Sequence, residues 1–433
     1  MEARWVRYAL IVLLAFPAFL PFNFVYRFGV NALHWDQWEF IPTLVRFFDG
    51  ELRLSDLTEQ HNEHRLFFPR LIMLGLAALT RYNNVAEMYF NAGLLVAIGA
   101  LLLRAHVRSF GSSNRSLFTF LPVPWLLFTW RQYENLLWGW QLQITLCALA
   151  CVGSLWLLAG VKGLGWRWLG ATAAALVATF SFGSGITLWP VGLVVMLWQG
   201  RREGRMPWRA IGAWLAVAAV AGIMYTWNYQ RPGHNPSPLA FLQDLKGSVQ
   251  FFLAILGSVA TDHLATGAAF GTLLLAACAV LFIERRRGRL EPGPTTFALG
   301  LLLFAGASAI LVLVGRAGFG KDFGLTSRYI TLTMFGFIGL HRAVLALQEP
   351  SRRGLLMGIL LAATVASVFS SFTSGLAAGF GTRGHYQRTR EILLTLETRR
   401  DDEVGLVYVH VDEVRKRAAE LKRLGLNVYA PEP

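Results

Sequence analysis

The sequence predicts an all-α polytopic membrane protein with about 11 transmembrane helices, outer interfacial helices and a small polar C-terminal α/β unit. First, 55% of the 433 residues are hydrophobic and only 15% are charged, against roughly 25% charged in an ordinary soluble domain. Second, apolar stretches of about 20 residues recur along the chain, each long enough to cross a hydrocarbon core of roughly 30 Å. Third, the bases behind the net charge of +14 lie in short loops between these stretches.

Basic runs such as 201–209 (RREGRMPWR) and 284–289 (ERRRGR) separate apolar segments instead of forming one soluble face. We therefore expect no nucleic acid partner, and we interpret the runs as the cytoplasmic excess of Lys and Arg. The three cysteines, Cys147, Cys151 and Cys278, lie inside apolar segments, so neither a disulfide framework nor a zinc motif is indicated.

The first apolar segment follows Arg4 and Arg7 and lacks a small-residue cleavage site, which favours an uncleaved span with a cytoplasmic N-terminus. Segment 66–80 is short and carries Arg70, so we expect an interfacial helix on the outer surface, beside a second one at 38–48. The predicted spans are at about 8–26, 84–103, 116–131, 137–160, 168–182, 185–199, 209–229, 264–283, 295–314, 328–347 and 354–373.

This arrangement places every basic loop on one side, provided that segment 247–260 is half-inserted or interfacial. It divides the chain into a transmembrane domain, 1–373, with a first outer loop at 34–83, and an extracytoplasmic unit at 374–433. The expected location is the bacterial inner membrane, with the C-terminus in the periplasm. The last 60 residues are polar, with 10 Lys plus Arg and 9 Asp plus Glu. Apolar residues have helical spacing at 385–398 and 411–424, and LVYVHV and LNVYA could form short strands, so we expect an α/β unit.

Ionisable groups are rare inside the predicted spans, where Gln141, Gln143 and His341 are the polar exceptions, and they are frequent in the outer loops. A transporter driven by ions would need such groups near the midplane. The distribution therefore favours chemistry at the outer surface.

Asp36 and Glu39, in HWDQWEF of the first outer loop, are three residues apart and would share one face of a helix. Such a pair suits general base catalysis, although acidic residues are also common in first helical turns. Because an apolar boundary disfavours the ionised form, we expect the pKa of Asp36 to be raised. Glu39 is the better candidate for a purely structural role.

The stretch QHNEHR places His61 and His64 three residues apart, with Glu63 and Arg65 beside them. The pattern indicates substrate contact, with helix capping and headgroup contact as the structural alternative. The two histidines could share a divalent cation, but the further ligands that zinc needs are not identifiable. No other cofactor is indicated by the sequence.

Outer loop 316–328 (RAGFGKDFGLTSR) carries Arg316, Lys321 and Arg328 among three glycines, followed by Tyr329. Glycines allow close approach of the backbone to an anion that the cations would neutralise, and plain headgroup contact is the alternative. The GxGxxxG spacing is not a dinucleotide fingerprint, and no Walker sequence occurs.

Two further outer clusters mix hydrogen-bonding groups with aromatic faces, as sugar sites do. They are RQYEN, with Tyr133 and Glu134, and NYQRPGHNPSP, with His234. Loop solvation explains either cluster taken alone.

This pattern resembles the polytopic glycosyltransferases of the GT-C superfamily, such as protein O-mannosyltransferases and aminoarabinose transferases. Asp36 after the first span, the stretch QHNEHRLFFPR and the basic end of the second span, Arg104 to Arg108, are similar in order and spacing. Members often show two adjacent acids or HPP, where this chain has DQWE and HNEH. The strings YENLLWGWQLQ and GRAGFGKDFGLTSRY are similar to those of uncharacterised bacterial membrane proteins.

The resemblance implies transfer of a sugar from a polyprenyl-phosphate donor to an acceptor hydroxyl on a glycan, lipid or protein, at the outer leaflet and with inversion. Asp36 would be the general base, and cationic side chains would stabilise the departing lipid phosphate. The alternatives are a polymerase or ligase of lipid-linked glycans and a non-enzymatic lipid-glycan transporter. Membrane lipids are expected partners in each case.

Overall fold

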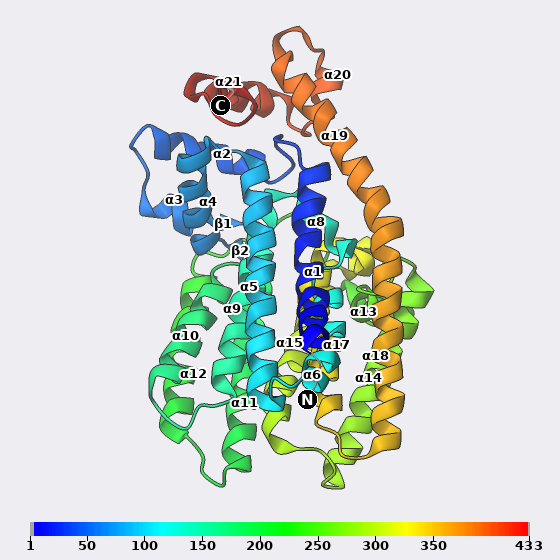
Figure 1. Cartoon of the computed structure of the whole chain (residues 1–433). Coiled ribbons are helices and arrows are strands. Elements are labelled where there is room, and N and C mark those ends of the chain that lie inside the picture. The colour runs from blue at the N-terminus through cyan, green and yellow to red at the C-terminus, as the bar shows by residue number, and fades with distance from the viewer. Residues whose placement is uncertain (1–3, 432–433) are drawn as a thin grey trace.

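The computed structural model describes residues 4–431, which form a bundle of helices capped at one end by smaller helices (Figure 1). Seven helical segments are long and apolar enough to cross a membrane. They contain α1 (Arg4–Phe28), α5 (Asn84–Phe110), α9 (Leu142–Leu158), α12 (Trp208–Thr226), α14 (Leu264–Arg286), α15 (Pro292–Arg316) and α18 (Pro350–Ser370) with its continuation α19 (Leu376–Leu394). The predicted total of 11 spans stays a prediction.

Shorter helices complete the bundle. They are α6 (Asn114–Thr119), α7 (Pro122–Leu127), α8 (Tyr133–Leu137), α10 (Trp166–Thr179), α11 (Leu188–Arg202), α13 (Leu245–Gly257), α16 (Ile330–Thr333) and α17 (Phe335–Leu345). The predicted span 116–131 is therefore not one helix. Pro122 and Pro124 lack the N–H groups that a continuous helix needs, so the chain restarts at α7.

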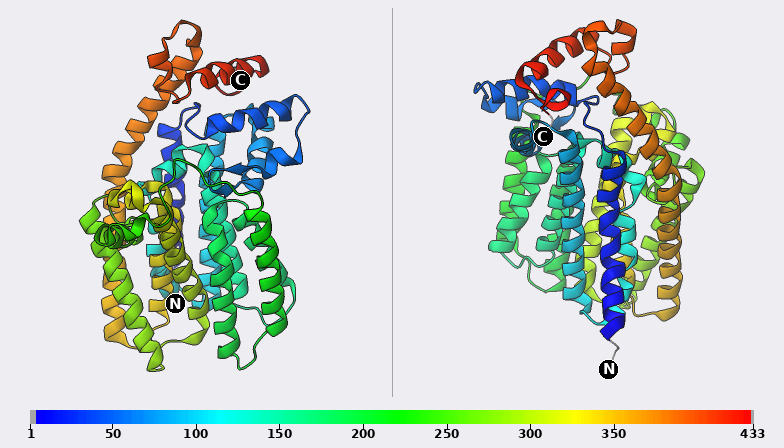
Figure 2. Two further views of the ribbon diagram at one scale, coloured as in Figure 1. Left: turned by 180° about the vertical axis from the view of Figure 1, so that it is seen from behind. Right: turned by 45° about the horizontal axis from the view of Figure 1, so that its top comes forward.

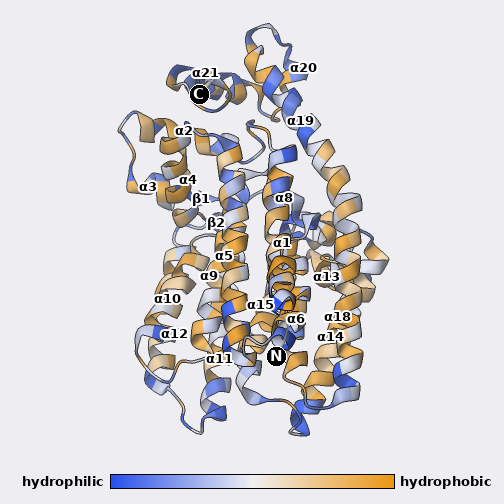
Figure 3. Cartoon of the chain, viewed as in Figure 1, coloured by the Kyte–Doolittle hydropathy of each residue, from blue (hydrophilic) through white to orange (hydrophobic). Residues whose placement is uncertain are grey.

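The basic loops gather at one end of the bundle, which we call the basic end. Figure 1 places there the connections from α5 to α6, α9 to α10, α11 to α12, α14 to α15 and α17 to α18. Figure 3 shows hydrophilic residues at both ends and hydrophobic residues along the middle. The five basic loops that the sequence predicts on one side therefore lie at the same end of the fold (Figure 1).

Segment 34–83 covers the opposite end with α2 (Gln37–Phe48), α3 (Leu54–Thr58), the strands β1 (Gln60–His61) and β2 (His64–Arg65), and α4 (Phe67–Thr80). The helices α2 and α4 match the two predicted interfacial helices in position. The helix α4 has 14 residues and ends at Thr80, and the following Arg81 has a left-handed φ of 52°. It is therefore too short to cross a membrane.

The C-terminal helices pack on segment 34–83. A second hydrophobic cluster, separate from the core of the bundle, joins buried residues of the two segments, among them Trp38, Leu44, Val414 and Leu421. Figure 2 shows α21 (Val411–Leu424) lying over α2, while α20 (Asp401–Val404) lies at the end of α19. Helical structure runs from α18 through a π-turn at Ser371–Gly375 into α19, across the predicted domain boundary at 373.

The predicted strands in the C-terminal unit were wrong, because residues 374–431 contain helices and turns with no strand. After α21, Gly425 and Asn427 adopt positive φ values of 62° and 54°, which an extended strand does not allow. The backbone N–H of Asn427 donates to the carbonyl of Arg81 at 2.8 Å. The segment LNVYA is thus fastened to the turn after α4.

Candidate functional site

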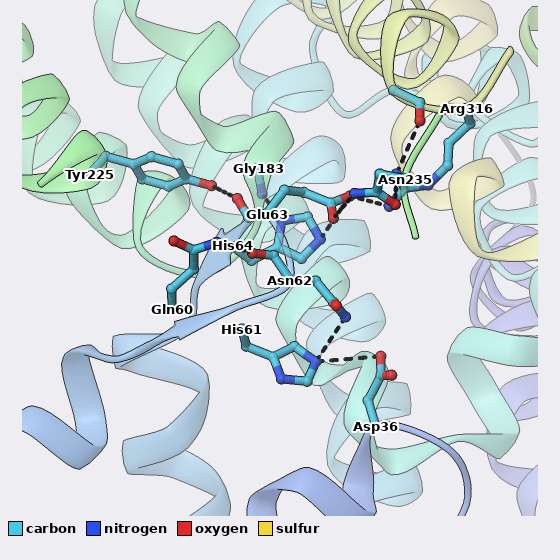
Figure 4. Close-up of polar contacts among 11 residues, drawn as sticks. Asp36, Gln60, His61, Asn62, Glu63, His64, Gly183, Tyr225, Asn235 and Arg316 are labelled. Atoms are coloured by element: carbon cyan, nitrogen blue, oxygen red, sulfur yellow. Dashed lines mark hydrogen bonds and ion pairs between the residues drawn. The ribbon is translucent and has the colours of Figure 1, made fainter. Parts of the chain in front are cut away.

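A short hairpin presents the histidines that the sequence singles out. Strands β1 and β2 are antiparallel, with His61 opposite His64. Asn62 forms the turn with a φ of 49°, a conformation that Asn tolerates better than most residues. Figure 4 shows the two imidazoles reaching different partners, so the hairpin joins two polar clusters.

The first cluster holds His61 between two carboxylates. Its Nε2 lies 3.5 Å from Oδ2 of Asp36, and its Nδ1 lies 3.3 Å from Oε2 of Glu39. Asp36 immediately precedes α2 and Glu39 lies in the first turn, so both reach the same ring, as their spacing predicts. The ring is buried and packs edge-on against Trp140.

The partner of Nε2 in His61 depends on whether that nitrogen carries a proton. The amide nitrogen of Asn62 lies 3.2 Å from Nε2 and can donate to it only when that nitrogen is unprotonated. Asp36 accepts a proton from Nε2 only when that nitrogen is protonated. A ring that carries its proton on Nε2 therefore pairs with Asp36, and a ring that carries it on Nδ1 alone pairs with Asn62.

Asp36 is ionised at neutral pH. Burial raises the pKa of this carboxyl, but its hydrogen bond to His61 and the charges of His61, Arg328 and His64 lower it by more, so the net pKa is below the ordinary value. The expectation of a raised pKa was therefore wrong, because the apolar boundary is not the only influence. The effect of Arg328 also shows that the glycine-rich loop lies within electrostatic range of Asp36.

The second cluster is centred on Glu63 (Figure 4). Its carboxylate pairs with Arg316 at the end of α15 and accepts a hydrogen bond from Nδ2 of Asn235 at 3.1 Å. Arg316 also donates to Oδ1 of Asn235 at 3.0 Å. The hydroxyl of Tyr225 donates to the Glu63 carbonyl at 2.6 Å. Residues far apart in the chain thus fix the tip of the hairpin.

The charges in this second cluster are set by burial and pairing. Burial lowers the pKa of His64 to about 4, and its Nδ1 accepts a hydrogen bond from the N–H of Gly183 at 3.1 Å. Burial raises the pKa of Glu63, but the charges of His64 and Arg316 and the hydrogen bond from Asn235 lower it to about 2. At pH 7, His64 is neutral and Glu63 is ionised.

Both arginines of the glycine-rich loop have carboxylate partners inside the chain. Arg316 pairs with Glu63, and Nη2 of Arg328 lies 3.6 Å from Oε1 of Glu134. The hydroxyl of Ser327 donates to Glu134 at 2.7 Å. The sequence pointed to an external anion as their partner, whereas these cations already have internal carboxylate partners. The Arg328 side chain remains 29% exposed.

The remaining candidate site residues from the sequence include Tyr329, Arg65, His234 and Lys321, and only some of them contact other parts of the chain. Tyr329 is buried, with its ring 6.0 Å from the Arg328 guanidinium. Arg65 donates to the carbonyls of Thr58, Tyr225 and Trp227 and fastens the hairpin to the end of α12. The side chains of His234 and Lys321 are exposed and make no hydrogen bond or ion pair within residues 4–431.

A cavity of about 300 Å³ lies against His34, two residues before Asp36. Its walls include Tyr133, Glu134, Trp138 and Tyr386. The Nδ1 atom of His34 and the Nε1 atom of Trp138 are buried and have no hydrogen-bond partner within the described chain. Aromatic faces beside polar groups suit a ligand that is apolar on one side and hydroxylated on the other.

Several residues of these clusters carry no local signal in the sequence. Tyr225 and Ser327 act through contacts with residues more than 160 positions away. Asn235 lies in the polar outer loop NYQRPGHNPSP, but its contact with Glu63 could not be predicted from the sequence. Glu87 is a buried acid inside α5, accepting from Nε2 of Gln37 at 3.4 Å, so the spans contain more ionisable groups than we expected.

The sequence suggested that His61 and His64 could share a divalent cation. Their rings turn to different partners, and within residues 4–431 no group of three or more His, Cys, Asp or Glu is arranged to hold a metal ion.

Comparisons with protein-family models, with curated proteins and with solved structures find no match for this chain.

Proposed function

We propose that the protein is a membrane glycosyltransferase that moves a sugar from a polyprenyl-phosphate donor to an acceptor hydroxyl. The observation that carries the proposal is the meeting of Asp36, Glu39 and His61 at the end of the bundle opposite the basic end. The Asp36 side chain is 27% exposed, so an acceptor can reach it. Its lowered pKa keeps the carboxylate ionised at neutral pH, and it also makes Asp36 a weaker base than an unperturbed Asp.

In the proposed reaction the acceptor hydroxyl gives its proton to the Asp36 carboxylate while its oxygen attacks the anomeric carbon. The bond from that carbon to the phosphate oxygen breaks, and its electron pair leaves with the lipid phosphate. Attack opposite the leaving group inverts the anomeric centre. General base catalysis of this kind is worth about 10² to 10⁴ in rate.

Arg328 is our candidate for stabilising the departing phosphate. It is partly exposed, lies within electrostatic range of Asp36 and already faces Glu134 at 3.6 Å. A phosphate would have to compete with Glu134 for the guanidinium. Charge-assisted hydrogen bonds to phosphate are strong enough for that exchange. Glu39 holds the opposite side of the His61 ring and serves as a positioning residue.

The test is sugar transfer from polyprenyl-phosphate donors by purified protein in nanodiscs. Asp36→Asn keeps the size of the side chain but cannot take the proton, so transfer should fall by about 10² or more. Glu39→Gln should reduce transfer less. Asp412→Asn, an exposed acid of α21, is the matched control and should keep the wild-type rate.

Wild-type transfer by Asp36→Asn would remove Asp36 as the base. If the wild-type protein transfers nothing from any such donor, the polymerase or ligase and the transporter become the leading hypotheses. A transporter would move a fluorescent lipid-linked glycan across the membrane of proteoliposomes without forming a glycosidic bond.

A further inference from the structure

A second cavity lies at the basic end, away from the site described above. Its volume is about 350 Å³, and it lies where the ends of α5, α9, α10, α15 and α17 meet. Its polar lining comes from Arg108, Ser109, Arg167 and Arg342, and aromatic residues form other parts of its wall. The lining contains no acidic residue.

Arg342 has an unusual environment for a charged residue. It is only 7% exposed, and it donates through Nη2 to the carbonyl of Ala105 at 3.1 Å and to the hydroxyl of Ser109. Its Nε atom is buried and has no hydrogen-bond partner within residues 4–431. Within the same residues, no carboxylate forms an ion pair with Arg108, Arg167 or Arg342. Burying a guanidinium without a counter-charge is costly.

Aromatic rings hold these cations without neutralising them. The Arg342 guanidinium lies 5.2 Å from the ring centre of Phe297 and 5.5 Å from that of Phe110. Arg167 lies 5.3 Å from the ring centre of Trp166. Cation–π contacts orient a guanidinium and leave its net charge unchanged, so the cavity retains a positive charge that its own walls do not balance.

We propose that this cavity binds a phosphate group, carried either by an anionic phospholipid headgroup or by a small soluble molecule. Arginine forks match the tetrahedral array of phosphate oxygens. Basic pockets between transmembrane helices are suited to anionic headgroups. The buried Arg342 would then have its counter-charge, and Arg108 and Arg167 would contact the more exposed oxygens. The site is independent of the proposed transfer reaction.

The first arm of the test measures retained lipid. Protein is purified from nanodiscs of phosphatidylcholine with 20% phosphatidylglycerol, and lipid bound after detergent washing is quantified by native mass spectrometry. We expect about one phosphatidylglycerol per wild-type chain, and about tenfold less in Arg167→Gln. Arg205→Gln, an exposed arginine of the same end, is the control and should behave as wild type.

The second arm titrates the detergent-solubilised protein with inorganic phosphate and pyrophosphate by calorimetry. A soluble ligand is supported if the wild-type protein binds phosphate or pyrophosphate saturably, if Arg167→Gln loses this binding, and if Arg205→Gln keeps it. Arg342→Gln should abolish binding in whichever arm is positive, and circular dichroism checks its helix content. Equal losses in Arg167→Gln and Arg205→Gln, or no binding in either arm, would overturn the proposal.

Discussion

At the scale of single residues, the hairpin keeps two nearby histidines in different electrostatic environments. His61 faces two carboxylates, whereas His64 lies 3.7 Å from one, that of Glu63, accepts from the Gly183 N–H and has a pKa that burial lowers to about 4. The pKa of His in an unfolded chain is about 6.5. Between pH 6.5 and pH 4 the unfolded chain therefore binds more protons at His64 than the folded chain does. Stability must fall as the pH falls through this window.

His64→Asn tests this sign. The Asn amide oxygen can still accept from the Gly183 N–H, but the side chain does not titrate, so the variant should lose less stability between pH 7 and pH 4. The difference should be up to about 3 kcal/mol, at 1.36 kcal/mol per pKa unit. Thermal unfolding in detergent at several pH values measures it. His234→Asn, which changes an exposed histidine, is the control and should keep the wild-type dependence of stability on pH. If His64→Asn also keeps that dependence, His64 does not contribute to it.

The sequence identified Asp36, Glu39, His61 and Glu63 because polar residues crowd within a few positions between apolar segments. It could not predict that Glu63 meets Arg316, which is 253 residues away. It also misjudged the pKa of Asp36, since that value depends on His61 and Arg328 as well as on burial. Local spacing predicts which side chains share a face, and only the fold decides which charges meet.

At the scale of elements, the hairpin depends on Arg65. A two-stranded hairpin is marginal by itself, and here Nε and Nη2 of Arg65 donate to carbonyls at the end of α12. Gln60 and the backbone of Gln230 add a further link at 2.9 Å. The position of both histidines therefore rests on contacts with α12.

Replacing Arg65 should loosen the hairpin without unfolding the bundle. Hydrogen bonds from a charged donor are worth about 1.5 to 3 kcal/mol, so amide exchange at residues 60–65 should be about tenfold faster in Arg65→Gln. Arg65→Lys should be intermediate, because an ammonium cannot reproduce the planar fork. Hydrogen exchange with mass spectrometry measures this. Unchanged exchange would assign the rigidity of the hairpin to Glu63 instead.

Hydropathy predicted the seven helical segments that are long and apolar enough to cross a membrane, because such a segment needs little more than length and apolar character. It predicted one helix at 116–131 where prolines break the chain. It also predicted strands at 406–411, where the structure has a turn and loop leading into α21, and at 426–430, where it has a short 3-10 helix at Asn427–Tyr429. Short apolar runs are ambiguous, since burial against α2 and α4 can satisfy them without a sheet. Tertiary packing therefore determines the conformation of these segments.

At the scale of the whole molecule, the gathering of basic loops at one end predicts the orientation in the membrane. Reporter fusions at residues 205 and 288 should report the cytoplasm. Fusions at residues 234 and 433 should report the periplasm. A cytoplasmic C-terminus would remove the predicted topology and would place the proposed transfer site on the wrong side for an outer-leaflet donor.

The last prediction concerns the contact between the two ends of the chain. Leu421 is fully buried in the hydrophobic cluster that joins the C-terminal helices to segment 34–83. Two polar contacts lie beside that cluster: Arg417 donates to the carbonyl of Trp38 at 2.9 Å, and Tyr408 donates to Glu39 at 3.2 Å. The C-terminal unit therefore supports the helix that carries Glu39.

Leu421→Ala should weaken this docking by about 2 to 5 kcal/mol, the usual cost of deleting a buried leucine side chain. Trypsin should then cleave faster near Arg399 and Arg400, while the bundle keeps its helix content by circular dichroism. Leu406→Ala, which changes an exposed leucine, is the matched control. If sugar transfer is established, Leu421→Ala should also lower its rate, because α2 loses the contacts at Trp38 and Glu39. Faster cleavage with an unchanged rate would mean that α2 holds Glu39 and Asp36 without help from the C-terminal unit.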